Sequence, residues 1–114
     1  MSTVIEGRKF QLWEYHVSHG SLLIRSPAEP GLDTSVDIIF IGVQYLAAPR
    51  HLGQITISEA NEIELASIKK TIPNKSIKSR AWLLRNANQR FVVTAVAMKI
   101  EEHRGDIFDS PFNS

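Results

Sequence analysis

Cysteine is absent from this 114-residue chain. Its absence excludes disulfide bonds, thiol nucleophiles and thiolate metal sites, and it fits the reducing environment of the cytoplasm. A long apolar run is lacking too, because the best candidate, residues 36–48, is interrupted by Asp37 and Gln44. Roughly 18 uninterrupted residues are needed to span a bilayer. The N-terminal residues carry charges where a signal peptide has its apolar core, so we expect a cytoplasmic protein outside the membrane.

A strong charge of either sign is also lacking. Lysine and arginine number 13 against 12 acids, which gives a formal net charge of +1. Such a chain has no general attraction to nucleic acid or to anionic membranes, so any such function needs a local patch. The hydrophobic share of 43% is that of an ordinary folded protein. We expect a single domain over residues 1–114, with a loose arm at 1–8 and a tail at 103–114.

The sequence does contain a run typical of a buried strand, residues 36–48, which read VDIIFIGVQYLAA. A period of two leaves both of its faces mainly apolar, which predicts a central strand that is covered on both sides. β-Branched and aromatic residues favour a strand over a buried helix. Gly42 indicates a bulge or a close approach of backbone. Asp37 is the one acid inside the strand, and we expect it to pair with a neighbouring-strand arginine such as Arg25.

Weaker patterns place the remaining strands. Alternating residues and turn sequences predict hairpins over residues 9–25 and 80–101, and a short strand over residues 53–57. The last strand of the second hairpin is apolar on both faces, so we pair it centrally with residues 36–48. The tail carries Ile107, Phe108 and Phe112, which can dock on the body.

One helix is predicted, over residues 58–72. Asn61 and Glu64 have the spacing of a capping box, Ser58 is a rival N-cap, and the apolar stripe comprises Leu65, Ile68 and Ile72. The predicted fold is α+β and mostly β, with about six strands in a curved antiparallel sheet or small open barrel and the helix packed on it. One helix covers only one face, so we expect sheet curvature or a second subunit to cover the other, and we favour a homodimer.

The histidines are the first candidates for chemistry. Glu14 shares a strand face with His16, so their side chains can pair, and His19 lies across the predicted turn from His16. No further metal ligand has a recognisable spacing, and the chain has neither a G-x-S-x-G elbow nor a glycine-rich phosphate loop. We predict no catalytic residue, no bound metal and no cofactor. These three residues remain a candidate site for a small hydrolase or a metal-dependent enzyme.

A basic stretch is the second candidate. Residues 69–90 carry seven cations and no acid. An aromatic side chain among cations can stack a base beside bound phosphates. The competing interpretation is a solvated surface that is balanced by the acids near the C-terminus. The candidate basic patch comprises Lys69, Lys70, Lys75, Lys78, Arg80, Trp82, Arg85 and Arg90.

Three phrases of the sequence resemble, as a set, a family of small uncharacterised bacterial proteins: LWEYHVSHGSLLIRS, VDIIFIGVQYLAAPR and IFDSPF. The resemblance extends over most of the chain and implies a bacterial cytoplasmic protein. It carries no catalytic residue that maps onto this sequence.

No catalytic constellation stands out, so we expect a non-enzymatic binding or protein-interaction module of unknown ligand that self-associates. The first alternative is a small hydrolase or metal-dependent enzyme that uses His16 with Glu14 or His19. The second is a weak nucleic-acid binder that uses residues 69–90. Metal analysis tests the first alternative, and salt-dependent binding to oligonucleotides tests the second.

Overall fold

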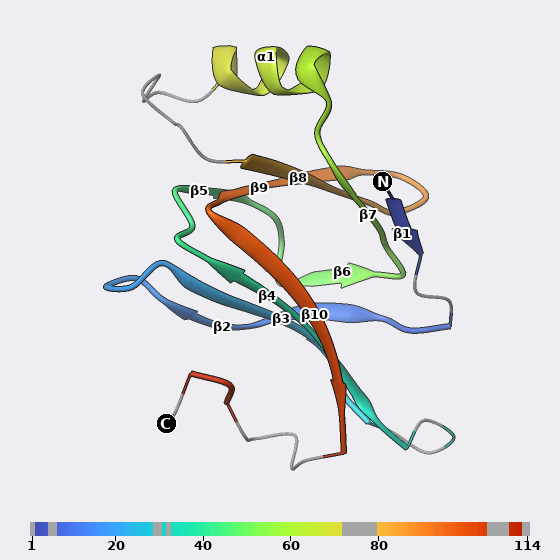
Figure 1. Cartoon of the computed structure of the whole chain (residues 1–114). Helices are drawn as coiled ribbons and strands as arrows, with labels where there is room; N and C mark the ends of the chain where they lie inside the picture. The colour runs from blue at the N-terminus through green and yellow to red at the C-terminus, as the bar shows by residue number, and fades with distance from the viewer. Residues whose placement is uncertain are drawn as a thin grey trace.

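A computed structural model gives the fold, and it describes residues 2–4, 7–28, 31, 33–71, 80–104 and 110–112. Ten strands and one helix lie in these residues (Figure 1). Their bounds are β1 Ser2–Val4, β2 Phe10–His16, β3 Ser21–Ser26, β4 Ser35–Ile41, β5 Tyr45–Ala47, β6 His51–Gly53, β7 Thr56–Glu59, α1 Glu62–Thr71, β8 Arg80–Arg85, β9 Arg90–Ala95 and β10 Ala97–His103.

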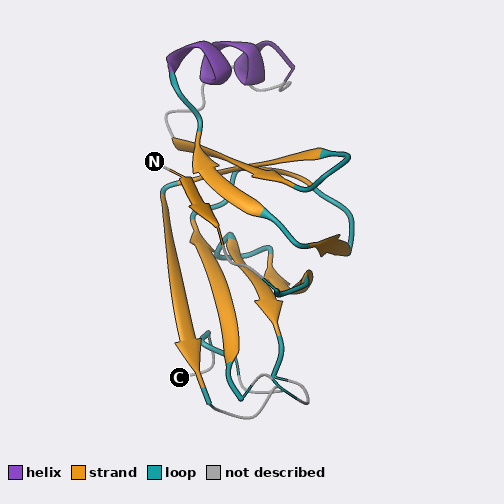
Figure 2. Ribbon diagram, turned by 90° about the vertical axis from the view of Figure 1, so that its right-hand side faces the viewer, coloured by secondary structure: helices purple, strands orange, loops and turns teal. Residues whose placement is uncertain are grey.

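The strands form two antiparallel sheets of five strands each. The helix-side sheet has the order β1-β7-β8-β9-β5, and the tail-side sheet has the order β10-β4-β3-β2-β6. Figure 2 shows the two sheets one below the other, with α1 across the outer side of the helix-side sheet. The predicted α+β, mostly β fold is confirmed. The prediction of about six strands was too low, and the described strands do not close into a barrel.

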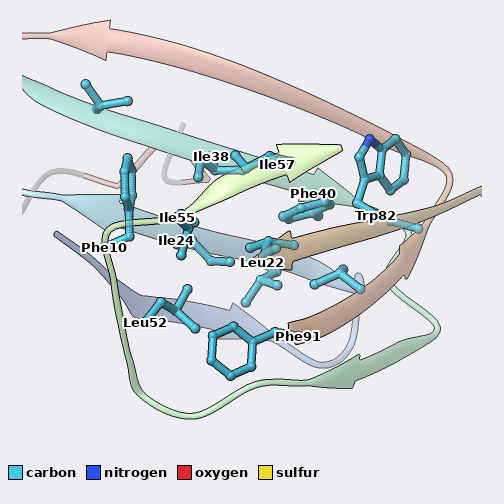
Figure 3. Packing of buried hydrophobic residues seen from close by; sticks show 14 residues of the cluster. Phe10, Leu22, Ile24, Ile38, Phe40, Leu52, Ile55, Ile57, Trp82 and Phe91 are labelled. Atoms are coloured by element: carbon cyan, nitrogen blue, oxygen red, sulfur yellow. The ribbon is translucent and has the colours of Figure 1, made fainter. Parts of the chain in front are cut away.

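The main core lies between the two sheets (Figure 3). Leu22 and Phe40 reach into it from the tail-side sheet, and Trp82 and Leu84 from the helix-side sheet; all four are at most 3% exposed. The rings of Phe40 and Trp82 meet edge to face with centroids 5.6 Å apart, a favourable aromatic geometry. Each sheet therefore covers the inner face of the other sheet.

The helix covers the outer face of the helix-side sheet. Ile68 is 3% exposed and packs with Ala81 and Leu83 of β8 in a second, smaller cluster. Leu65 is packed against this cluster. Ile72, the last residue of the predicted stripe, lies outside the described residues.

The predicted capping box sets the start of the helix. The backbone N–H of Glu64 donates to Asn61 Oδ1 at 2.8 Å, and the backbone N–H of Asn61 donates to Glu64 Oε1 at 3.0 Å. Ser58, the rival cap, lies inside β7, where it pairs with Leu83. The helix therefore begins four residues later than the predicted range, because the chain before Asn61 is held in the sheet.

The predicted central strand is in fact two strands that belong to different sheets. β4 lies in the tail-side sheet, β5 lies in the helix-side sheet, and Gly42 lies between them with a φ of 70°. The last predicted strand divides in the same way at Val96, into β9 and β10. Strands that switch sheets at a bend form the corners of packed β-sheets.

The two bends lie against each other. A Cβ atom on Gly42 would be 2.7 Å from Cγ2 of Val96, so the close approach expected at this glycine is confirmed. The predicted pairing of the two long segments is confirmed as well, because β4 pairs with β10 and β5 with β9. Both β5 and β10 lie at sheet edges, however, and not in the centre as expected.

Parts of the predicted arm and tail lie in strands. Ser2–Val4 form β1, which pairs with β7, and β10 runs on to His103. Residues 110–112 lie against β2, whereas Ile107 and Phe108 lie outside the described residues. No helix in the described part of the chain has the length and apolar character needed to cross a membrane.

Candidate functional site

The outer face of the tail-side sheet carries a buried ion pair. Arg25 of β3 and Asp37 of β4 are direct partners in the strand register, so the two side chains meet on one face. Arg25 Nε donates to Asp37 Oδ1 at 2.6 Å, and Nη2 donates to Oδ2 at 2.9 Å. The side chains are 1% and 2% exposed. The pairing expected for Asp37 is confirmed.

His103 joins this pair from β10. Its Nε2 lies 2.8 Å from Asp37 Oδ2, so the carboxylate is shared between a guanidinium and an imidazole. The register places Glu101 directly opposite Asp37, two residues before His103. The side chains of Arg25, Asp37 and His103 therefore come from three adjacent strands, β3, β4 and β10.

A β-bulge places an aromatic ring over the arginine. The register of β2 against β3 shifts between Leu12 and Glu14, so two consecutive residues oppose Leu23. The extra residue, Trp13, holds its ring 5.4 Å from the guanidinium carbon of Arg25. Strict alternation along β2 would set Trp13 on the same face as Tyr15, and the bulge is the reason that the two side chains lie on different faces.

A cavity of about 420 Å³ opens beside the ion pair. Its lining comes from the ends of β3, β4 and β10 and from residues 110–111. It comprises Arg25, Asp37, Glu101, Glu102, His103, Ser110 and Pro111. We call this the outer-face cavity.

The predicted pair of Glu14 and His16 lies beside the cavity and holds the C-terminal segment. His16 Nε2 contacts Glu14 Oε2, and Ser110 Oγ donates to the same oxygen at 2.9 Å. The ring of Phe112 meets His16 edge to face at 5.4 Å. His19, the third candidate, lies exposed in the turn after β2. The structure thus joins two of the three candidates and adds Ser110.

The side chains of Glu14, His16 and Ser110 are hydrogen-bonded in the wrong order for nucleophilic catalysis. A serine nucleophile needs a base hydrogen-bonded to its hydroxyl, with a third group behind the base. Here the carboxylate of Glu14 stands between the hydroxyl of Ser110 and the imidazole of His16. Among the described residues, no three His, Asp or Glu side chains converge as a metal site would require. The cluster fastens residues 110–112 to β2.

The basic patch is divided by the fold. Trp82 is 3% exposed in the main core, with the guanidinium of Arg80 at 4.8 Å from its ring, so its faces are not available to a base. Arg80 makes two hydrogen bonds with Glu59, at 2.6 and 3.0 Å. These bonds lower the pKa of Glu59 and raise the pKa of Arg80. Lys75 and Lys78 lie outside the described residues.

The other described cations of the patch lie on α1 and the second hairpin. Arg85 donates to Glu64 Oε2 at 2.6 Å and to Ser58 Oγ at 2.9 Å. The exposed cations are Lys70 and Arg90, and Lys69 is half-buried. The acids that balance the two arginines are Glu59 and Glu64, just before the basic stretch in sequence, and not the C-terminal acids that the sequence suggested.

Glu64 gives a test of this pairing by pH. The backbone N–H of Asn61, and then the guanidinium of Arg85, hold the pKa of Glu64 below its ordinary value of 4.5. A carboxyl with a lowered folded-state pKa stabilises the fold above its unfolded pKa and loses this contribution as pH falls through the folded one. We therefore expect Glu64→Gln to be less stable than wild type at neutral pH, and we expect this deficit to shrink in acid as the pH falls below 4.5.

Denaturant melts at neutral and at acidic pH measure this difference. Glu62→Gln is the matched control, because it makes the same change on an exposed side chain in the same helical turn. A Glu64→Gln deficit of the same size in acid would contradict the proposed contribution of the charge.

Of the cavity residues, the sequence predicted Arg25 and Asp37 as a pair, and Glu101 could have been added to them. The pairing of the last strand with β4 was predicted, and a correct register would have placed Glu101 opposite Asp37. The position of His103 depends on β10 extending into the predicted tail, and that of Ser110 on the docked C-terminal segment. No local pattern reports either feature.

Comparison of the chain with protein-family models, with curated proteins and with solved structures finds no match. Its function is therefore argued from its own geometry.

Proposed function

We propose that this protein is a non-enzymatic binding module and that the outer-face cavity holds a small polar ligand with a cationic group. The observation that carries the proposal is the position of the Arg25–Asp37 pair, which lines a cavity of about 420 Å³. Sites for small ligands have volumes of roughly 300 to 1,000 Å³ and a few well-placed polar groups.

The energetics of the ion pair support a role in recognition. Removing two charges from water costs several kcal/mol each, and apolar residues of similar volume are often as stabilising as the pair itself. Arg25 and Asp37 are almost fully buried, so they bear this cost. A buried pair that borders a cavity can instead present fixed charges to a ligand.

More carboxylates than guanidinium groups line the cavity. Its carboxylates are those of Asp37, Glu101 and Glu102, and they lie beside the guanidinium of Arg25 and the imidazole of His103. That guanidinium already makes two hydrogen bonds with Asp37. Glu101 and Glu102 are about half or more exposed at the rim, where Lys99 Nζ lies 3.1 Å from Glu101 and Arg8 Nη2 lies 3.6 Å from Glu102. An incoming cation would exchange with these partners.

Nuclear magnetic resonance titrations test this proposal with three probes of similar size: ethylguanidinium, propylamine and propionate. We expect the two cations, and not propionate, to shift the backbone amides of residues 101–103. Glu101→Gln should weaken cation binding about threefold, as expected for one partly exposed charge pair. Glu62→Gln, the same change on the exposed face of α1, should leave it unaltered. Equal shifts from propionate, or no shift at residues 101–103, would overturn the proposal.

The two alternatives have less support. The hydrolase alternative lacks a base on the hydroxyl of Ser110, since Glu14 stands between Ser110 and His16. The nucleic-acid alternative loses its aromatic platform, because Trp82 is buried. The proposal retains the bacterial cytoplasmic homodimer that the sequence predicted.

A further inference from the structure

β10 lies at the margin of the tail-side sheet (Figure 2). Within the described chain it pairs with β4 and with no other strand. A sheet edge presents a row of backbone N–H and C=O groups that can template another strand. The edge of β10 is also long, at seven residues, and α1 lies on the other sheet.

The middle of this edge is complementary to its own reverse. Around Ile100, Lys99 stands on one side and Glu101 on the other, whereas the next pair sets Met98 against Glu102. We propose that two copies of the chain associate through antiparallel pairing of β10 with the partner's β10, with Ile100 at the two-fold axis. The two tail-side sheets then form one continuous sheet of ten strands. This inference does not depend on the proposed ligand.

Symmetry and charge select this register. A two-fold axis perpendicular to an antiparallel ladder must pass between a residue and its own copy. Centred on Ile100, it sets Lys99 opposite the partner's Glu101 twice, and cross-strand pairs of opposite charge stabilise a sheet. Centred on Lys99 or on Glu101, it would set like charges directly opposite each other, which is unfavourable.

The side chains are placed for such pairs. Lys99 and Glu101 share the outer face of the sheet, and Nζ lies 3.1 Å from Oε1 within one chain. Their side chains are 59% and 49% exposed, so both can reach a neighbouring strand. On the opposite face Ile100 is half-buried and packs against the main core, so the two copies of Ile100 would extend the core across the axis.

Size exclusion with light scattering at micromolar concentration measures the association. We expect wild type to have twice the chain mass, and Lys99→Glu and Glu101→Lys to raise the dissociation constant about tenfold or more, because each variant sets like charges opposite. The double variant Lys99→Glu/Glu101→Lys should restore the dimer. Lys70→Glu, the same charge change on the exposed face of α1, is the matched control and should remain dimeric.

Mixing the two single variants separates contacts between chains from contacts within one chain. Lys99→Glu carries two acids and Glu101→Lys carries two bases, so only the heterodimer has opposite charges across the interface. We expect the dimer mass to return on mixing, although neither chain regains its internal Lys99–Glu101 pair. A wild type that stays monomeric at all concentrations would overturn the proposal, and so would a dimer that is indifferent to both single variants.

Discussion

Asp37→Leu is expected to lower the free energy of unfolding by about 3 to 5 kcal/mol, the usual cost of leaving one charge of a buried pair without its partner. The side chain of Arg25 is 1% exposed, so its charge would stay buried after losing the two hydrogen bonds that it donates to Asp37. His103 loses its contact with the same carboxylate. Denaturant melts followed by circular dichroism measure the change.

The double variant Arg25→Met/Asp37→Leu is the control for this prediction. It removes both charges and fills the space with apolar side chains, so we expect it to recover most of the lost stability. Such a recovery would show that the pair contributes little to stability. If the double variant were as unstable as Asp37→Leu alone, packing and not the unpaired charge would explain the loss.

Gly42→Ala is expected to lower the free energy of unfolding by about 2 to 5 kcal/mol, through two effects that add. The backbone there has a φ of 70°, which costs an L-residue roughly 1 to 2 kcal/mol. The new Cβ would lie 2.7 Å from Cγ2 of Val96, and forcing extra atoms into a packed site costs about 1 to 3 kcal/mol.

Two further variants separate these effects. Gly53→Ala changes a glycine with a φ of 72° whose Cβ would meet no described atom within 4 Å, so it should show the backbone cost alone. Val96 is 62% exposed, so Val96→Ala should itself cost little, and in combination with Gly42→Ala it should recover part of the loss. Equal losses of stability for Gly42→Ala and Gly53→Ala would mean that the contact with Val96 does not contribute to the effect of Gly42→Ala.

Some features of this protein follow from local sequence. The capping box of Asn61 and Glu64 is correct because its hydrogen bonds join residues three apart, which the helix itself brings together. The pair of Glu14 and His16 is correct for a similar reason, since residues two apart share a strand face. Arg25 and Asp37 were predicted as neighbours once their strands were placed side by side.

The bends and the cavity are decided by tertiary structure. The period of two in residues 36–48 correctly indicates two apolar faces, but it does not report that the strand leaves one sheet for the other at Gly42. The bend lies against a second bend at Val96, some fifty residues later, whose backbone N–H donates to the carbonyl oxygen of Ile41. The part of the segment before the bend therefore packs in the tail-side sheet, and the part after it packs in the helix-side sheet. Each part has its own neighbours.

The sequence by itself determined the fold class, the single described helix and the partner of Asp37. Periodicity and helix capping depend on residues a few positions apart, and the partner of Asp37 follows once two neighbouring strands are paired. The tertiary structure decided the number of sheets, the covering of β2 by residues 110–112 and the position of His103 beside the ion pair. These features join residues up to 96 positions apart. Contacts of that range depend on the whole packed chain and leave no signal in any short stretch of it.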